Sequence, residues 1–178
     1  VLEYDPATDE VKVLMDDLWF ANGIGVDKDE TYIVVSETFQ SRVLKYSLTN
    51  GSTFVAVDKL TGYPDGHDCS HETGFCYVPV PSAALPVMKL IYAIPSPFDR
   101  FFRVLLLLLP RSLSPQIVAY GAVYEYFPGD ETKPGGITRL LQDPEGKDIS
   151  LLTGVTVNGS KLYLGSLRNK FIGVYDLK

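Results

Sequence analysis

One short motif recurs along this sequence: a polar residue, then a glycine, then a short apolar segment. It stands at residues 22–23, at 65–66 and at 153–154. The first two glycines are 43 residues apart and the third follows after 88, an interval that falls to about the same period once an insertion at 81–120 is set aside. Four short strands in roughly 40–50 residues form a propeller blade. A β-sandwich also has short strands and turns, but not this fixed period, so the sequence predicts consecutive blades of a β-propeller.

Each copy of the motif continues on the same plan of strand, turn, second strand, loop and third strand. Turn-forming residues follow the first strand as DKDE from Asp27, SHETG from Ser70 and NGS from Asn158,. A fourth, outer strand fits the segments that begin at Ser52 and Gly136. We therefore predict an all-β fold of about three blades over residues 1–178.

Composition agrees with a globular β protein. The chain is 46% hydrophobic and 21% charged, and its 11 Tyr and 9 Phe favour strands,. The net charge is −6 and the 16 Lys and Arg form no basic stripe. Because such a surface repels phosphate backbones, nucleic acid is excluded as a partner class.

The insertion at 81–120 lacks strand alternation and is rich in Pro, Leu and Phe. Its segment Phe98–Leu109 is bounded by prolines, which predicts a short helix,. One alternative is a cover that packs its Leu face on the propeller rim. The other is an apolar patch that contacts an acyl substrate or a membrane surface, flanked by Arg100, Arg103 and Arg111,. The apolar run is far shorter than the roughly 20 residues that cross a bilayer.

Two cysteines, Cys69 and Cys76, flank the predicted turn of the second copy. They face each other if two short strands form a hairpin there, and can then form a disulfide. The alternative is two half-buried strand residues. The spacing alone leaves both open.

The recurring polar residues are the candidate site. Since the innermost strand of each blade lines the central channel, Asn22, Asp65 and Thr153 are expected at equivalent positions facing one mouth. Amide and carboxylate oxygens that converge from separate segments suit Ca²⁺, so Asn22 and Asp65 are candidate metal ligands. His67 lies two residues after Asp65 and either serves as a general base in the channel or bonds to a neighbouring blade,.

Several segments together resemble the strictosidine synthase-like family, and within it the branch typified by adipocyte plasma membrane-associated protein. They are LEYDPAT, LWFANGIGVDKDETYIVVSET, RVLKY, GYPDG, LQDPEGK and KLYLGSLRNKFIGVYDL. The resemblance implies a six-bladed propeller and a protein of the secretory pathway or a membrane. The sequence opens in mid-pattern at Val1, so we expect these residues to be part of a longer propeller.

The resemblance also implies three functions. More distant relatives are calcium-dependent hydrolases of lactones and aryl esters, whose metal ligands match Asn22 and Asp65, together with a Glu from an earlier blade. Strictosidine synthase itself is a lyase that uses a late Glu for a Pictet–Spengler condensation, but residues 152–158 contain no Asp or Glu,. The third function is a non-catalytic propeller that binds partners at a membrane. No serine-hydrolase elbow, phosphate loop or zinc-protease motif is present,.

Overall fold

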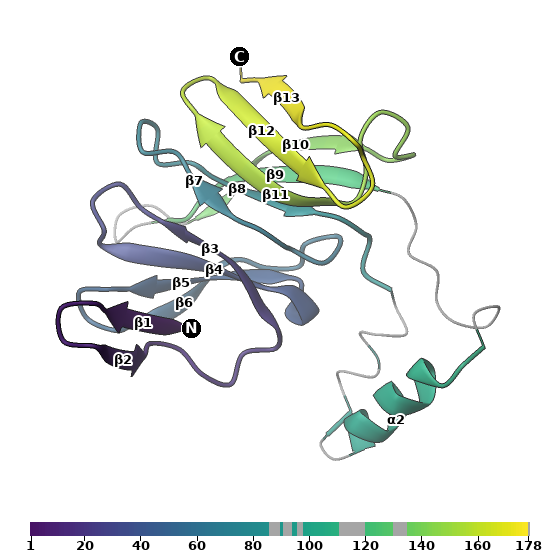
Figure 1. Cartoon of the computed structure of the whole chain (residues 1–178), viewed down its shortest axis with the longest axis horizontal. Coiled ribbons are helices and arrows are strands. Elements are labelled where there is room, and N and C mark those ends of the chain that lie inside the picture. Colours follow the sequence, from purple (N-terminus) through teal and green to yellow (C-terminus); the bar gives the residue numbers. More distant parts are fainter. Residues whose placement is uncertain (86–89, 91–93, 96–97, 111–119, 130–134, 178) are drawn as a thin grey trace.

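The structure, a computed structural model, describes residues 1–85, 90, 94–95, 98–110, 120–129 and 135–177. In these residues, four antiparallel sheets are arranged side by side, and each sheet follows the chain from strand to neighbouring strand (Figure 1). The first is a hairpin of β1 (Leu2–Asp5) and β2 (Glu10–Val13). The second contains β3 (Ala21–Val26), β4 (Tyr32–Glu37), β5 (Arg42–Ser47) and β6 (Thr53–Val57).

The two later sheets repeat this plan. One contains β7 (Asp68–Cys69), β8 (Cys76–Val80), β9 (Gly121–Phe127) and β10 (Gly136–Asp143). The other contains β11 (Leu152–Asn158), β12 (Lys161–Ser166) and β13 (Gly173–Asp176). Antiparallel meanders of this kind, repeated around an axis, are propeller blades. The prediction of an all-β chain of about three consecutive blades is confirmed.

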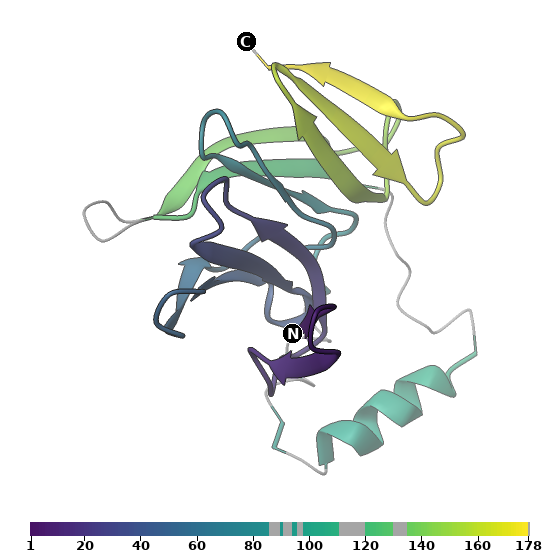
Figure 2. The ribbon, with the colours of Figure 1, turned by 60° about the vertical axis from the view of Figure 1, so that its left-hand side comes forward.

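Two of the strand connections bear on the site. A single 3₁₀ turn, η1 (Thr38–Gln40), joins β4 to β5. The predicted insertion separates β8 from β9 and contains the predicted helix, α2, at Phe98–Leu107. Figures 1 and 2 show α2 standing apart from the sheets. Among the described residues, no helix is both long and apolar enough to cross a membrane, and Arg111 lies outside them.

Apolar side chains fill the spaces between neighbouring sheets. Val34, Val43 and Leu60 pack against Val78 and Tyr126 of the next blade, and all five are almost fully buried. A second cluster continues from that blade to the third and contains Tyr77, Val123, Leu152, Val155, Leu162 and Leu164. Burial of such side chains stabilises a fold by about 1.5–3 kcal/mol each. The blades are therefore held face to face chiefly by apolar packing.

The recurring glycines are where the inner segments of successive blades meet. The N–H of Gly23 donates to the carbonyl of Asp65 at 3.1 Å, and the N–H of Gly66 donates to the carbonyl of Thr153 at 2.9 Å. A Cβ on Gly23 would lie 2.4 Å from the first of these oxygens, and one on Gly66 would lie 2.5 Å from the second. Only glycine permits so close an approach. We call these two bonds the inter-blade glycine bonds.

We expect Gly66→Ala to lower the free energy of unfolding by more than about 2 kcal/mol, because its methyl group would collide with rigid backbone. Gly136→Ala is the matched control, since a Cβ at Gly136 meets nothing within 4 Å. Chemical denaturation of the purified protein measures both. Equal stability of the two variants would contradict the role given to the glycine bonds.

Candidate functional site

The inter-blade glycine bonds bring the three predicted polar residues to one end of the propeller. Asn22 and Asp65 stand directly before the bonded glycines, Thr153 supplies the carbonyl that accepts from Gly66, and all three residues are half-buried. We call this end, where the inner segments of the blades begin, the mouth. The equivalence that the repeat predicts is thus present in the backbone, although residues 65 and 66 precede the short strand β7 rather than lie within it.

Asp65 is the central group at the mouth. Burial raises the pKa of its carboxyl group, and hydrogen bonds from the Asn22 side chain and the Gly66 N–H lower it in part. Its backbone is fixed separately, because its N–H donates to the Pro79 carbonyl at 3.0 Å and its carbonyl accepts from Gly23. The main chain of Asp65 therefore joins the blades without using its carboxyl group.

The 3₁₀ turn after β4 supports this arrangement. The Thr38 hydroxyl donates to the Pro64 carbonyl at 2.8 Å, and the Thr38 N–H donates to the Phe20 carbonyl at 3.1 Å. Thr38 is buried, so these bonds are shielded from water. They hold the segments before Asn22 and before Asp65 against each other. Sequence reasoning missed Thr38, since nothing in its local sequence marks it.

Glu37, next to Thr38, is a second residue that sequence reasoning missed. It is 1% exposed, and its Oε1 accepts the Trp19 N–H at 2.9 Å. Its Oε2 accepts from Arg42 Nε at 2.5 Å. Oε1 thus holds the chain that leads into β3, and Oε2 holds Arg42 at the start of β5. Glu37 lies opposite Ala21 in the sheet, and it is a structural carboxylate rather than a third member of the Asn22–Asp65 pair.

The donor chemistry at the mouth fits a hard cation. Asn22 and Asp65 offer an amide oxygen and a carboxylate from two different blades, and the Asn22 side chain is near enough to lower the pKa of the Asp65 carboxyl group. Ca²⁺ takes six to eight oxygen ligands, so these two side chains form part of a coordination sphere. A desolvated carboxylate with a raised pKa is stabilised by a nearby positive charge.

His67 lies between blades and has both ring nitrogens in use. Its Nδ1 is 3.1 Å from Ser36 Oγ on β4, and its Nε2 is 2.5 Å from the Tyr126 hydroxyl on β9. Burial lowers the pKa of His67 to about 3 and raises the pKa of Tyr126 well above its usual value. These contacts correspond to the second alternative, a histidine bonded to a neighbouring blade. Because both ring nitrogens contact protein hydroxyl groups, the structure favours this alternative over the general base that the sequence also allows.

Cys69 and Cys76 lie directly opposite each other in β7 and β8 and form a disulfide. Their sulfur atoms and a ring nitrogen of His67 lie within 4.8 Å of one another. The disulfide removes the thiolates that a soft metal needs. The disulfide therefore joins β7 to β8, and we do not assign the cluster as a second metal site.

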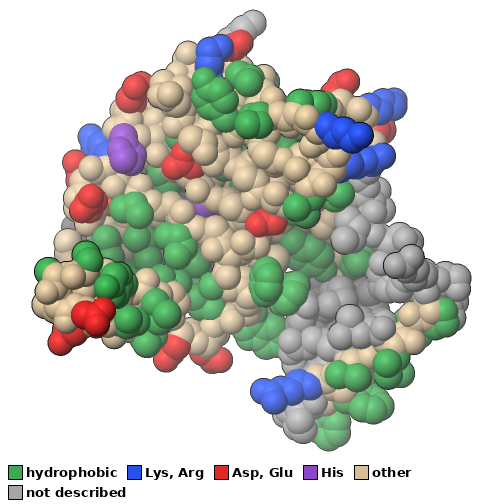
Figure 3. Space-filling view, in the orientation of Figure 1, with side chains coloured by type: hydrophobic (Ala, Val, Ile, Leu, Met, Phe, Trp, Pro, Cys, Tyr) green, Lys and Arg blue, Asp and Glu red, His purple; other side chains and the backbone are tan. Residues whose placement is uncertain are grey.

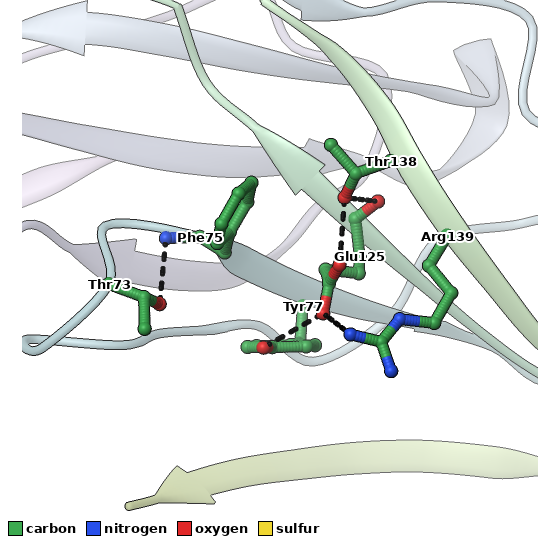
Figure 4. A network of polar contacts seen from close by, with 6 residues as sticks. All are labelled: Thr73, Phe75, Tyr77, Glu125, Thr138 and Arg139. Atoms are coloured by element: carbon green, nitrogen blue, oxygen red, sulfur yellow. Dashed lines mark hydrogen bonds and ion pairs between the residues drawn. The ribbon is translucent and has the colours of Figure 1, made fainter. Parts of the chain in front are cut away.

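A further buried carboxylate, Glu125 on β9, belongs to the interior of its blade (Figure 4). Its Oε1 accepts from the Thr138 hydroxyl at 2.9 Å, and its Oε2 accepts from Tyr77 at 3.1 Å and from Arg139 at 3.0 Å. Burial and the nearby Glu125 charge raise the pKa of Tyr77 to about 12. The network links β8, β9 and β10. Because Glu125 is saturated with donors, we assign it a structural role.

Residues 1–51 match the sequence family described as strictosidine synthase. Over 99% of its length, the chain is 30% identical to Protein STRICTOSIDINE SYNTHASE-LIKE 10 of Arabidopsis thaliana, of which it covers 46%. The chain is thus similar to strictosidine synthase-like proteins along almost its whole length. It is also 29% identical to Adipocyte plasma membrane-associated protein of Rattus norvegicus, over 97% of its own length and 45% of that protein. The chain therefore spans about half the length of the curated relatives it matches.

Among solved structures, the chain is similar to a gluconolactonase from Xanthomonas campestris. The TM-score is 0.56 at 17% identity, over 97% of this chain and 48% of that one. Such a likeness concerns the fold alone. It supports the propeller architecture predicted from the repeat.

The position of His67 predicts a pH-dependent stability. In the unfolded chain a histidine binds a proton near pH 6.5, whereas His67 in the folded chain does so near pH 3. Between these values the unfolded state binds more protons, so stability is lost as the pH falls from about 6.5 towards 3. The slope due to this group approaches about 1.4 kcal/mol per pH unit. Urea unfolding of the protein and of His67→Gln at several pH values isolates the contribution of His67 to the free energy of unfolding. The same pH dependence in both proteins would contradict the lowered pKa of His67.

Proposed function

We propose that the protein is a calcium-dependent hydrolase of esters or lactones, with its active site at the mouth. The observation that carries this proposal is the backbone bond from Gly23 to the Asp65 carbonyl, which brings Asn22 and Asp65 together from successive blades, and the Asn22 side chain lowers the pKa of the Asp65 carboxyl group. Two oxygen donors of the type that Ca²⁺ prefers are thereby held together by backbone bonds. The gluconolactonase that shares the fold is, by its name, a lactone hydrolase, which favours the same reaction class here.

The roles of the residues follow from their positions. Asp65 supplies a negative charge that burial leaves poorly solvated, and the Asn22 side chain partly offsets this by lowering the pKa of the carboxyl group. A bound calcium ion would polarise the carbonyl of the substrate and stabilise the developing oxyanion. Thr38 and Glu37 act as positioning residues, because they bond to the segments that precede Asn22 and Asp65.

The residues at the start of β11, the third position of the mouth, disfavour the lyase alternative. Thr153 stands where the resemblance to strictosidine synthase implies a catalytic Glu, and a threonine hydroxyl does not exchange protons near neutral pH. Neighbouring Leu152 and Val155 are buried in the apolar cluster between blades. The β11 segment therefore supplies no acid or base for a condensation reaction.

A second candidate function is contact of the mouth with a membrane surface. The insertion leaves the propeller beside the site, since the Tyr63 N–H donates to the Ser82 carbonyl at 3.1 Å. On α2, the exposed fractions of Phe98, Phe101 and Val104 are 64%, 64% and 54%, and green hydrophobic atoms cover much of the helix in Figure 3. Side chains of this kind insert into the headgroup region of a bilayer.

The loop at 167–172, which joins β12 to β13, adds a second apolar contact at the same end. It follows Ser166, which lies opposite Leu152 at the start of β11. Its apolar members Leu167, Phe171 and Ile172 are exposed, and the cationic Arg168 and Lys170 between them are exposed as well. Apolar side chains interleaved with cations suit an anionic lipid surface. One named relative is a plasma membrane-associated protein, which agrees with this candidate.

For the hydrolase, we expect Asp65→Asn to weaken calcium binding by roughly a hundredfold or more, since even residues outside the coordination sphere change affinity by 10–100-fold. Hydrolysis of aryl esters and lactones should fall in parallel and should stop in a chelator. Asp176→Asn is the matched control, because that carboxylate is exposed on β13. Turnover that survives both the chelator and Asp65→Asn would refute the proposal.

For the membrane candidate, we expect the double variant Phe171→Ser, Ile172→Ser to reduce binding to anionic liposomes several-fold, because the apolar area that inserts is lost. Val11→Ser, in the β1–β2 hairpin, removes an equally exposed apolar side chain elsewhere and should have no effect. Co-sedimentation measures both. Equal binding by the two variants would exclude the 167–172 loop as the contact, and hydrolysis of a water-soluble ester should not change in either.

A further inference from the structure

Two asparagines share a motif that the proposed function does not use. Asn50 and Asn158 each stand in the tripeptide Asn-Gly-Ser, whereas the other asparagines of the chain, Asn22 and Asn169, are followed at the second position by Ile and Phe. Asn-x-Ser, with x other than Pro, is the acceptor for N-linked sugar in proteins of the secretory pathway. The motif is short, so it needs support from the structure.

Both tripeptides form tight turns between neighbouring strands. Asn50 lies in the turn from β5 to β6, and Asn158 ends β11 directly before the turn into β12. Gly51 and Gly159 have φ values of +73° and +54°, a conformation that glycine adopts easily,. The positive φ accounts for the glycine of each turn. It does not account for the serine that follows.

The asparagine and serine of each tripeptide are open to solvent. Both asparagines and both serines, Ser52 and Ser160, are exposed. A Cβ added at Gly159 would meet nothing within 4 Å. A sugar attached to either asparagine would therefore extend into water without disturbing the apolar packing between blades.

The two turns lie at the same end of the propeller, opposite the mouth. Asn158 is at the far end of β11 from Thr153. Asn50 follows Ser47, which lies opposite Tyr32 at the end of the blade away from Glu37 and the start of β3. In Figure 1 both turns lie on the side away from α2. Sugars there would leave the mouth uncovered.

The disulfide is an independent observation that points to the same compartment. Cys69 and Cys76 are bonded and almost fully buried. Disulfides form and persist in oxidising compartments such as the lumen of the endoplasmic reticulum, and they are rare in the cytosol. That lumen is also where sugars are attached to Asn-x-Ser.

We propose that Asn50 and Asn158 are N-glycosylated. In the reaction, the amide nitrogen of the asparagine forms a bond to the anomeric carbon of an oligosaccharide carried on a lipid diphosphate. The bond from that carbon to the diphosphate oxygen breaks, the diphosphate leaves with the electron pair, and the amide loses one proton to a base of the transferase. The hydrated sugars hold the end that carries the two turns in water, so ligands and surfaces approach the protein from the mouth.

The test uses the protein produced through the secretory pathway of a eukaryotic cell line. Treatment with an amide-cleaving glycosidase in H₂¹⁸O should lower its mass and convert both asparagines to ¹⁸O-labelled aspartates, which peptide mass spectrometry locates. Asn50→Gln and Asn158→Gln should each remove one glycan. Ser160→Ala should remove the glycan of Asn158, and Ser160→Thr should retain it. Asn169→Gln is the control and should change nothing.

Several results would overturn the proposal. Absence of sugar at either asparagine in the exported protein would overturn it for that residue. Conversion to aspartate without glycosidase would show spontaneous deamidation at Asn-Gly in place of glycosylation. Retention of the glycan in Ser160→Ala would exclude the tripeptide as the acceptor. None of these results bears on hydrolysis at the mouth, so the two proposals fail separately.

Discussion

The architecture of this chain depends on the bond that a glycine of one blade makes to the carbonyl of the next. Gly23 bonds to Asp65 and Gly66 bonds to Thr153, so the inner segments of three blades are joined in sequence at the point where they converge. Apolar packing between sheets supplies most of the stabilisation, but it is not directional. The glycine bonds set the register of one blade on the next, and they require a residue without a side chain because the approach is so close.

The same bonds explain why a site can exist at the mouth. Asp65 has its backbone engaged between blades, and Asn22 is placed beside it because the neighbouring Gly23 donates to the Asp65 carbonyl. Asn22 and Asp65 meet in this way, and Asp65 keeps a carboxylate that burial makes harder to ionise. Thr38 and Glu37 then hold the preceding segments, so the geometry of the pair does not rely on the pair alone.

The two ends of the propeller differ in chemistry. The mouth carries the oxygen pair, the root of the insertion and the apolar and cationic loop at 167–172. The opposite end carries short polar turns, including the two Asn-Gly-Ser tripeptides. A protein with this polarity presents one end to ligands or to a surface and the other to water. The hydrolase, membrane and glycosylation proposals are thus compatible with one orientation of the molecule.

The sequence by itself determined the repeat, the strand order and the positions of Asn22, Asp65 and Thr153, because a fixed period places equivalent residues at equivalent points of successive blades. It also predicted the helix in the insertion from its bounding prolines. Only the tertiary structure decided what the side chains contact. His67 bonds to Ser36 and Tyr126 from two blades, and Thr38 bridges Phe20 and Pro64. Local sequence does not encode such partners, since they lie tens of residues away and meet only when blades pack. The disulfide between Cys69 and Cys76 was likewise decided by the tertiary structure, because the register of β7 and β8 places the two residues opposite each other.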